Sequence, residues 1–505
     1  MSLFELRSGS PALAARPTAE NAHAAAEARS ETRGTPWWTL LAIAVLAAAG
    51  FAAVNRAVLV NGDSVVHLVW GRELLDGTLS TFAGGPTPHP SLLVLGAGTS
   101  LLGDVNSYAV TYVLFGPAAF GVLMAAAFEL GRRLSSRWAG AAAVLILGTS
   151  PGIVSVASAA RYDMAFAALV MTAVALEMSR PRRGTATLAC LAAAGLIRPE
   201  AWVLAAAYWL WIAPRLSWAA RARMAALAAL APVLWSLMDV LVMGDPLYSL
   251  HMTDAASEQL YGRYTAWENL EVAGRNLVWF LGVLPLLLPA CGVFMLARDR
   301  SRTAVPLLAT GTITLGIFLI LVARGMASSN RYLLVPVCAL GVLAAVAVDG
   351  AGRRTRSRVA ASMVLAVLLC LHLASRADVY SKLPTATPAA SALYENVRAL
   401  VGMPGVRQAL RECPEVSVPA GNMRPWFSLY SGRAPEAFAA DEAGRRHPDL
   451  FLAPGSPQAS KAALTRARFD EDASFDVPAG LRLAVRNEDW ALYVSPDSRC
   501  ARGLR

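Results

Sequence analysis

The chain has 505 residues, of which 56% are hydrophobic and 16% charged, and it carries a net charge of +10. Such a composition excludes a soluble globular protein, which needs more polar surface to stay dispersed. The basic residues occur in short clusters between apolar runs, without interleaved aromatic side chains, which excludes nucleic acid as a partner.

Residues 1–36 are rich in Ala, Arg and Glu and contain no apolar run. They predict a disordered cytoplasmic tail and not a signal peptide, which needs an apolar stretch near its start. After this tail, apolar runs of roughly 20 residues recur, the length that crosses a bilayer core. About eleven membrane-spanning helices are predicted, over residues 37–59, 106–131, 138–156, 163–179, 185–197, 200–213, 224–243, 277–297, 303–323, 331–349 and 358–375.

Arginine clusters follow every second predicted span. They lie at 132–137, 180–183, 215–223, 298–302 and 353–358. Short cytoplasmic loops carry an excess of basic residues, so these clusters and the N-terminus are predicted to be cytoplasmic. Because the number of spans is odd, residues 376–505 are predicted to lie outside the cytoplasm.

The first predicted outer loop, residues 60–105, begins with "NGDSVVHLVWGRELLDG". Its apolar residues recur near helical spacing, with His67 and the charged side chains on other faces, which predicts a helix lying on the outer membrane surface. Asp63 lies at the mouth of this helix, although from local sequence alone it can equally be an N-cap. Residues 89–104 are too short and glycine-rich to span, so an interfacial or re-entrant helix is predicted there.

Two further polar segments are predicted at the outer surface. "ARYD" places Arg161 and Asp163 at the outer end of the span 163–179, where Asp163 can also be an N-cap. "IRPEAW" places Arg198 and Glu200 between two short apolar pieces, where Pro and Glu also suit the start of a helix. Ionisable residues at such a depth are costly unless they are paired or wet, so they indicate function.

The remaining candidates lie later in the chain. The span 331–349 begins with Arg331 and Tyr332, which are also compatible with an interfacial anchor. Asp239 lies within the span 224–243 and needs a partner or water. His251 belongs to the second long outer loop, 244–276, and is compatible with ordinary loop packing.

These residues are all predicted to converge on the outer membrane surface. Carboxylates there can act as a base or hold a divalent metal ion, and arginines can bind a phosphate. The pattern therefore indicates chemistry on a membrane-borne, phosphate-bearing substrate taken from the outer leaflet.

Four segments occur in order along one hydropathy profile: "NGDSVVHLVWGRELLDG" followed by "HP", then "ARYD", "LIRPEAW" and "NRYLLVPVCAL". With them, residues 37–375 resemble the GT-C superfamily of integral membrane glycosyltransferases. The resemblance is greatest to the branch that holds bacterial protein O-mannosyltransferases and aminoarabinose transferases. It implies a helical membrane domain, a polyprenyl-phosphate sugar donor, and an envelope glycan, lipid or protein as acceptor.

The resemblance also implies roles for single residues. Asp63 matches the proposed catalytic base, Asp163 the acidic residue of the second outer loop, and Arg331 the arginine that neutralises the departing phosphate, with Arg161 or Arg198 beside it. Many relatives carry Asp-Glu in the first loop, whereas Asp63 is followed here by Ser64. The missing carboxylate weakens the case for a divalent metal ion shared by Asp63 and Asp163.

Residues 376–505 alternate between helical and strand-like segments, with turns rich in Pro and Gly, and predict a small extracytoplasmic α/β domain. Cys413 and Cys500 lie in this region, whereas the other cysteines lie in apolar runs. In an oxidising compartment the two are predicted to form a disulfide.

Three alternatives compete with a transferase. A transporter or flippase of an envelope lipid also uses broken helices with charged residues, but it usually shows paired half-repeats, and none is evident here. A polymer ligase or polymerase also uses lipid-linked sugars and outer arginines. The third is an inactive descendant that keeps the fold. Asp63 and Asp163 facing one outer cavity would favour the transferase.

Overall fold

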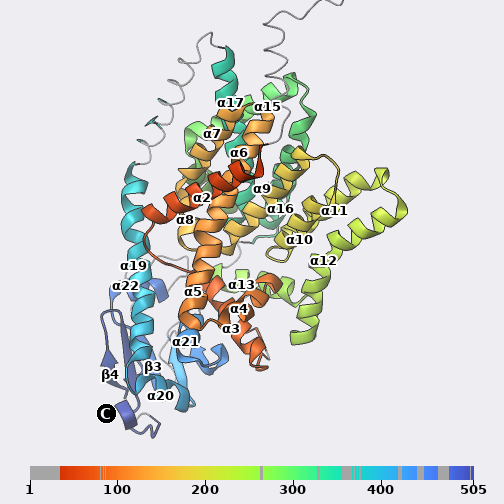
Figure 1. Ribbon diagram of the computed structural model, residues 1–505. Helices are drawn as coiled ribbons and strands as arrows, with labels where there is room; N and C mark the ends of the chain where they lie inside the picture. Colours follow the sequence, from red (N-terminus) through yellow and green to blue (C-terminus); the bar gives the residue numbers. More distant parts are fainter. Residues whose placement is uncertain are drawn as a thin grey trace, which may run out of the picture.

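The computed structural model is a bundle of helices with one small β-sheet at one end (Figure 1). The structure describes residues 35–354 and 377–504, apart from 80, 83–84, 86, 262–264, 327–329, 419–422, 441–447, 464–476 and 501, together with a few positions between 367 and 374. The predicted tail, residues 1–36, lies almost wholly outside the described residues, and the predicted span 358–375 lies largely outside them.

The helical part runs to residue 354. Its first half contains α2 (Trp37–Val54), α3 (Gly62–Leu75), α4 (Pro90–Ser100), α5 (Asp104–Val113), η1 (Leu114–Ala118), α6 (Ala119–Leu134), α7 (Arg137–Gly148), α8 (Pro151–Ser158), α9 (Tyr162–Ser179) and α10 (Thr185–Gly195). Its second half contains α11 (Glu200–Ile212), η2 (Ala213–Arg215), α12 (Trp218–Met243), α13 (Tyr248–Tyr261), α14 (Ala266–Leu281), α15 (Val283–Arg298), η3 (Arg302–Ala304), α16 (Val305–Ala323), η4 (Asn330–Leu333) and α17 (Leu334–Arg354).

Among the described residues, six helices are long and apolar enough to cross a membrane, or up to eight if each bent pair is one span. The predicted number of eleven is therefore not confirmed. The predicted span 138–156 is two helices, α7 and α8, that meet at 63° because Pro151 starts a new helix. The two short predicted spans, 185–197 and 200–213, correspond to α10 and α11, which have 11 and 13 residues.

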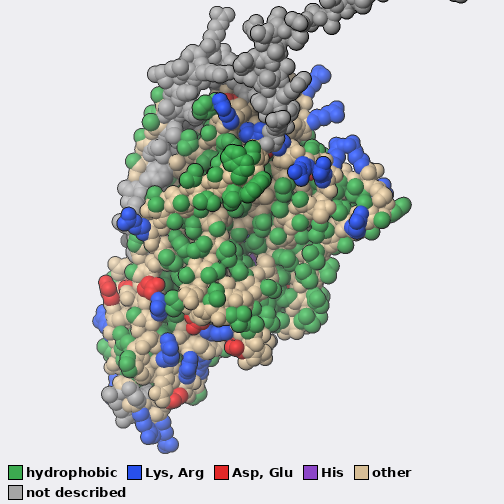
Figure 2. Space-filling view, viewed as in Figure 1, with side chains coloured by type: hydrophobic (Ala, Val, Ile, Leu, Met, Phe, Trp, Pro, Cys, Tyr) green, Lys and Arg blue, Asp and Glu red, His purple; other side chains and the backbone are tan. Residues whose placement is uncertain are grey.

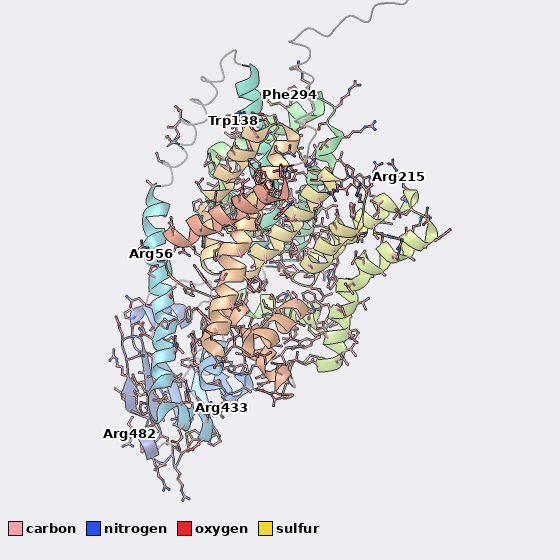
Figure 3. All side chains as sticks on the ribbon, in the orientation of Figure 1. Arg56, Trp138, Arg215, Phe294, Arg433 and Arg482 are labelled. Carbon is pink, nitrogen blue, oxygen red and sulfur yellow. A yellow bond between two sulfur atoms is a disulfide. The ribbon has the colours of Figure 1, made fainter. Side chains whose placement is uncertain are left out.

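The two ends of the bundle differ in their side chains. In the view of Figure 2, hydrophobic side chains cover the middle, Lys and Arg are visible at both the upper and the lower end, and Asp and Glu are visible mainly in the lower part. Arg215 and Trp138 lie toward the upper end, while Arg433 and Arg482 lie at the lower end with the sheet (Figure 3). The acidic side chains that are visible in this view therefore gather at the end that carries the sheet.

Helix α3 lies at the lower end of the bundle, where it packs against α4 and α21, and it is more deeply buried than expected (Figure 1). His67 and Glu73, which helical spacing places on the non-apolar faces of this helix, are buried by the rest of the protein. The reason is a close approach of α3 and α4, where a Cβ on Gly71 would lie 2.2 Å from the backbone nitrogen of Ala97. Gly71 of α3 and Gly96 of α4 therefore serve helix packing.

The C-terminal part contains helices on a mixed sheet. It comprises α19 (Ala377–Gly402), α20 (Val406–Glu412), β1 (Val416–Val418), α21 (Arg424–Ser431), η6 (Pro435–Ala437), β2 (Phe438–Ala440), β3 (Leu450–Pro454), α22 (Pro457–Ala463), β4 (Arg482–Arg486), β5 (Trp490–Val494) and η7 (Arg502–Leu504). The strand order is β2-β1-β3-β5-β4, with β1 parallel to β2 and β3, and with β5 antiparallel to β3 and β4. The side chains of Cys413 and Cys500 form a disulfide that joins the end of α20 to the end of the chain.

Helix α21 fastens this C-terminal part to α3. The Arg72 guanidinium donates hydrogen bonds to the carbonyl oxygens of Ser428 and Leu429, both at 3.1 Å. The indole of Trp426 lies next to Gly62, at the start of α3, and stacks on the ring of Tyr394 from α19. The residues that hold α3 thus come from a region more than 300 positions away, as the separations of 356 and 357 for the Arg72 contacts show.

Glu73 is buried at this junction, and its Oε1 atom has no hydrogen-bond partner among the described residues. Burial raises the pKa of the Glu73 carboxyl from 4.5 to about 7, the negative charge of Glu436 adds to the shift, and Arg72 opposes it. The folded protein therefore binds this proton more tightly than the unfolded chain, and its stability falls as the pH rises from about 4.5 to about 7.

Replacing Glu73 with Gln is expected to raise the unfolding temperature at pH 8, because the amide carries no charge to bury, and to leave it unchanged at pH 4. Thermal unfolding of the detergent-solubilised protein at both pH values measures the effect. Glu271→Gln, at a carboxylate with 59% exposure, is the matched control and should change neither value. A Glu73→Gln variant that is less stable than the wild type at pH 8 would contradict the assignment.

Candidate active site

Asp63 lies in the first turn of α3, and its carboxylate forms an ion pair with Arg331. The Oδ2 atom of Asp63 is 3.1 Å from Nη1 of Arg331, which lies in η4 just before α17. The N-cap of α3 is Asn61 and no side chain caps this helix, so the alternative interpretation of Asp63 as an N-cap is wrong. The carboxylate is 36% exposed and can therefore be reached by a substrate.

Asp163, Arg198 and Glu200 form a buried charge cluster. The Arg198 guanidinium donates from Nη1 to Asp163, and from Nε and Nη2 to Oε1 of Glu200 at 3.0 and 2.6 Å. Arg198 and Asp163 are almost fully buried, with side-chain exposures of 7% and 2%. Asp163 also is not the cap of its helix, because the N-cap position of α9 is Arg161, whose side chain makes no capping hydrogen bond. For Asp63 and for Asp163, the interpretation as a helix cap is thus replaced by a long-range ion pair.

The two ion pairs belong to one cluster. Arg331 interacts electrostatically with Asp163 as well as with Asp63. Tyr332, the next residue, presents its ring to the Arg198 guanidinium with 4.6 Å between the guanidinium carbon and the ring centroid. The structure therefore brings Asp63, Asp163 and their arginines together, as the outer-surface convergence predicted.

Arg161 differs from the other two arginines of the cluster. It is partly exposed, and within the described part of the chain no acid forms a hydrogen bond or ion pair with it. It still lies close enough to Asp163 to interact with its charge. The residue before it, Ala160, is buried with a positive φ of 41°, a strained conformation for a residue with a Cβ.

Backbone contacts from α3 hold this strained turn in place. The backbone N–H of Asn61 donates to the carbonyl of Ala159 at 2.8 Å, and the Ser64 hydroxyl donates to the carbonyl of Ala160 at 3.2 Å. Ser64, the residue after Asp63, thus links α3 to the turn before α9. Strain of this kind persists only where the surroundings enforce it, and it is frequent at functional sites.

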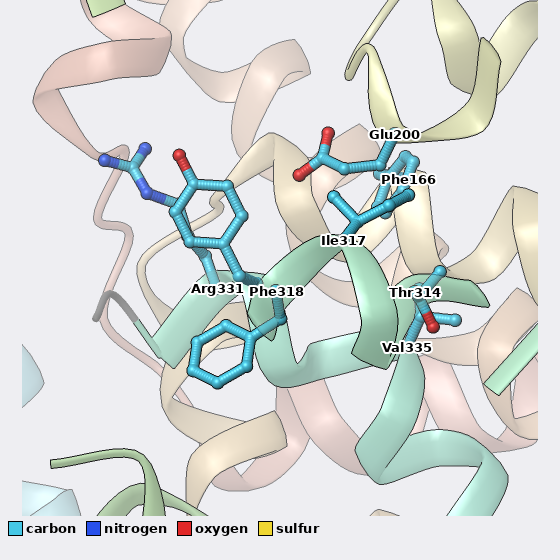
Figure 4. A pocket seen from close by; sticks show the side chains of 8 residues that line it. Phe166, Glu200, Thr314, Ile317, Phe318, Arg331 and Val335 are labelled. Carbon is cyan, nitrogen blue, oxygen red and sulfur yellow. The ribbon is translucent and has the colours of Figure 1, made fainter. Parts of the chain in front are cut away.

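A small pocket adjoins the cluster between α9, α11, α16 and α17. Its lining residues are Phe166, Glu200, Thr314, Ile317, Phe318, Arg331, Tyr332 and Val335. Figure 4 shows the Glu200 carboxylate directed toward the middle of this pocket, with apolar side chains around it. Its Oε2 atom is buried and has no hydrogen-bond partner among the described residues. The pocket thus combines an apolar wall with the edge of the charge cluster.

Two of the predicted candidates lie outside this cluster. Asp239 is buried in α12 and accepts hydrogen bonds from the hydroxyl and the backbone N–H of Ser249, at 2.7 and 2.9 Å. Its partner is therefore the first turn of α13, which gives it a structural role. His251 is exposed on α13, where its ring pairs with Asp245 at 2.8 Å.

The geometry does not fit a metal ion between Asp63 and Asp163. Each of these carboxylates already faces a guanidinium group, and Ser64 contributes a hydroxyl that is bound to a carbonyl. The described residues contain no cluster of three or more His, Cys, Asp or Glu side chains with metal-binding geometry. We therefore assign no step to a metal.

Two residues of the site were missed by the sequence reasoning. His89 and Tyr162 are buried and hydrogen-bonded to each other at 2.9 Å, and Tyr162 immediately precedes Asp163. Both stand in segments already singled out, the "HP" that follows the first helix and the Tyr of "ARYD". Their polar side chains beside predicted site residues were the available signal.

The fold matches known membrane glycosyltransferases. The chain is similar to ArnT from Cupriavidus metallidurans bound to undecaprenyl phosphate, with a TM-score of 0.53 and 15% identity over 91% of this chain and 98% of that one. It is also similar to the archaeal oligosaccharyltransferase AglB from Archaeoglobus fulgidus in complex with an inhibitory peptide and a dolichol-phosphate. There the TM-score is 0.51 and the identity 11%, over 85% of this chain and 71% of that one.

No protein-family model matches the chain, and no curated protein matches it by sequence. Both similar structures are GT-C glycosyltransferases, so the GT-C resemblance found in the sequence is confirmed for the fold. At these low identities the likeness shows the fold alone. What the site does has to be argued from its residues.

Proposed function

We propose that the chain is a membrane glycosyltransferase that moves a sugar from a polyprenyl-phosphate donor to an acceptor hydroxyl on the extracytoplasmic face. The observation that carries this proposal is the meeting of Asp63 and Asp163, 100 positions apart, around Arg331 in one cluster. The similarity of the fold to ArnT bound to undecaprenyl phosphate supports a lipid phosphate as the donor's carrier.

The arginines divide into two groups by their surroundings. Arg198 is paired with Asp163 and Glu200 and covered by the ring of Tyr332, so its role is to hold the side chains of the site in place. Arg161 is partly exposed and has no acid partner among the described residues, which suits it to bind the phosphate of an incoming donor. Arg331, 25% exposed, lies between the two acids and can stabilise the negative charge of the departing phosphate.

Asp63 is suited to the role of general base. Its Oδ2 is paired with Arg331, and Oδ1 has no hydrogen-bond partner among the described residues. As the acceptor oxygen bonds to the anomeric carbon, its proton passes to Asp63 and the bond from that carbon to the phosphate oxygen breaks. The polyprenyl phosphate leaves with the electron pair. Asp163, buried and neutralised by Arg198, keeps the guanidinium groups in place.

The proposed topology follows from the arginine clusters. With the N-terminus in the cytoplasm, the site lies at the extracytoplasmic ends of the helices, beside the C-terminal α/β domain. The Cys413–Cys500 disulfide suits the oxidising space that this orientation gives the domain. We therefore place the chain in the cell membrane, with residues 376–505 outside the cytoplasm.

The proposal is tested by purifying the protein with its native lipids and identifying bound polyprenyl phosphate by mass spectrometry. Replacing Arg161 with Gln removes the phosphate contact and is expected to lower the retained lipid phosphate about tenfold. The matched control is Arg275→Gln on α14, where an exposed arginine pairs with Glu271, and it should retain as much lipid phosphate as the wild type.

The same preparation in liposomes, supplied with a polyprenyl-phosphate sugar, should release polyprenyl phosphate together with a glycosylated acceptor. Retention of lipid phosphate without any sugar release, but with its movement between leaflets, would instead identify a flippase. Equal lipid retention by the Arg161→Gln variant and the wild type would contradict the role assigned to Arg161.

A further inference from the structure

We propose that His67, His89 and Tyr162 are positioning residues, forming a buried hydrogen-bonded chain that holds the two acid-bearing segments in register. The inference rests on the proposed function, because it assigns these residues to the transfer reaction. It concerns buried polar groups that the proposed mechanism does not use.

The chain connects three segments of the fold. Nδ1 of His67 lies 2.6 Å from the backbone carbonyl oxygen of Asp63, and Nε2 of His67 accepts the backbone N–H of His89 at 3.1 Å. The His89 ring in turn bonds through Nε2 to the hydroxyl of Tyr162 at 2.9 Å. Tyr162 starts α9 and immediately precedes Asp163. The path therefore runs from one acid to the other through α3, the entry to α4, and α9.

The hydrogen bonds define the form of His67. A carbonyl oxygen only accepts, so Nδ1 carries the proton, and Nε2 receives a backbone N–H, so it carries none. His67 is therefore a neutral imidazole, and burial lowers its pKa to about 4. A ring held neutral in this way does not exchange protons with substrate near neutral pH, which leaves it a structural and orienting role.

Close packing surrounds all three side chains. Their residue exposures are 2%, 5% and 4%. The His67 and His89 rings lie 5.0 Å apart, and those of His89 and Tyr162 lie 4.6 Å apart. Buried hydrogen bonds restrict the motion of the groups that make them, and the loss of one member leaves another without its partner. Nδ1 of His89 already has no hydrogen-bond partner among the described residues, so the orientation of this ring depends on its Nε2 bond to Tyr162.

Positioning matters here because the two acids come from distant segments, which the Asn61–Ala159 and Ser64–Ala160 hydrogen bonds join only at the turn before α9. Asp63 and Asp163 lie in helices that are separated along the chain, and each pairs with a different arginine. A displacement of a reacting group by about 1 Å can lower a reaction rate by about 100-fold. A chain of hydrogen bonds that ends next to both acids is placed to prevent such a displacement.

The test compares two tyrosine variants in the full-length protein in liposomes. Tyr162→Phe keeps the ring and removes the hydroxyl that bonds His89, whereas Tyr208→Phe removes a matched hydroxyl that bonds Glu177 near the other end of α9. We expect Tyr162→Phe to lower kcat about tenfold with the donor KM within about twofold, since positioning acts on the reacting geometry. Tyr208→Phe should leave kcat unchanged.

A double-variant cycle shows whether the residues act together. His67→Phe breaks the same chain at its other end, so its combination with Tyr162→Phe should lower kcat no further than the more damaging single variant. His67→Gln, which can restore part of the hydrogen bonding, should recover part of the lost kcat. Thermal unfolding of every variant confirms that the assay temperature lies below its unfolding midpoint.

Several results would overturn the inference. They are a wild-type kcat for Tyr162→Phe, independent effects of the two sites that multiply in the double variant, or an equal fall in kcat for Tyr208→Phe. These outcomes are distinguishable from a failure of the proposed function, in which the wild-type protein itself transfers no sugar from a polyprenyl-phosphate donor.

Discussion

Asp63→Asn is expected to lower the kcat of sugar transfer by about 10²–10⁴-fold, the usual contribution of a general base. The asparagine amide keeps the size of the side chain but cannot accept the acceptor's proton. The carboxylate does not cap its helix, so the loss does not act through α3 formation. Initial rates of sugar transfer in liposomes, at saturating donor and acceptor, measure the effect.

A second carboxylate–arginine pair provides the control for this experiment. Asp104, at the start of α5, lies 3.4 Å from Arg72 and is 42% exposed, close to the 36% of Asp63. Asp104→Asn should therefore reproduce the loss of a partly exposed ion pair without a loss of kcat. An Asp63→Asn protein that keeps a third or more of the wild-type kcat would exclude Asp63 as the base.

The buried cluster around Arg198 predicts the largest change in stability. Arg198→Leu leaves the carboxylates of Asp163 and Glu200 buried without their counter-charge, and the loss of one partner of a buried ion pair typically costs about 3–5 kcal/mol. We expect the free energy of unfolding to fall by that amount. Chemical unfolding of the detergent-solubilised protein, followed by circular dichroism, measures it.

Neutral partners should restore most of this stability. The cost arises from two unpaired buried charges, and replacing a whole buried ion cluster with neutral groups of similar volume is often tolerated. The triple variant Arg198→Leu, Asp163→Asn, Glu200→Gln should therefore approach wild-type stability while remaining inactive. If the triple variant is no more stable than Arg198→Leu, packing of the guanidinium against Tyr332 outweighs its charge.

The predictions for Asp63 and Arg198 both depend on ion pairs that could not be inferred from the order of the segments along the chain. The sequence placed Asp63, Asp163, Arg198 and Arg331 at one surface, and the structure brings them into one cluster. The sequence did not indicate that Arg331 pairs with Asp63 and that Arg198 pairs with Asp163. Partners separated by 268 positions, as Asp63 and Arg331 are, meet only through the packing of helices.

The membrane nature of the chain, by contrast, was determined by the sequence itself. Apolar runs of bilayer length have to be covered by lipid or by other helices, whatever their partners, and the arginine clusters between them carry the orientation. The number of spans was not determined in this way. The bend between α7 and α8 and the short helices α10 and α11 depend on how each piece packs in the bundle.

The sequence by itself thus determined the class of protein, its order of segments and the kinds of side chain at its outer surface, because hydropathy and charge act locally along the chain. Only the tertiary structure decided that α3 is buried, that His89 bonds to Tyr162, and which guanidinium neutralises which carboxylate. Burial and ion pairing depend on surfaces contributed by distant segments, and helical spacing contains no information about them.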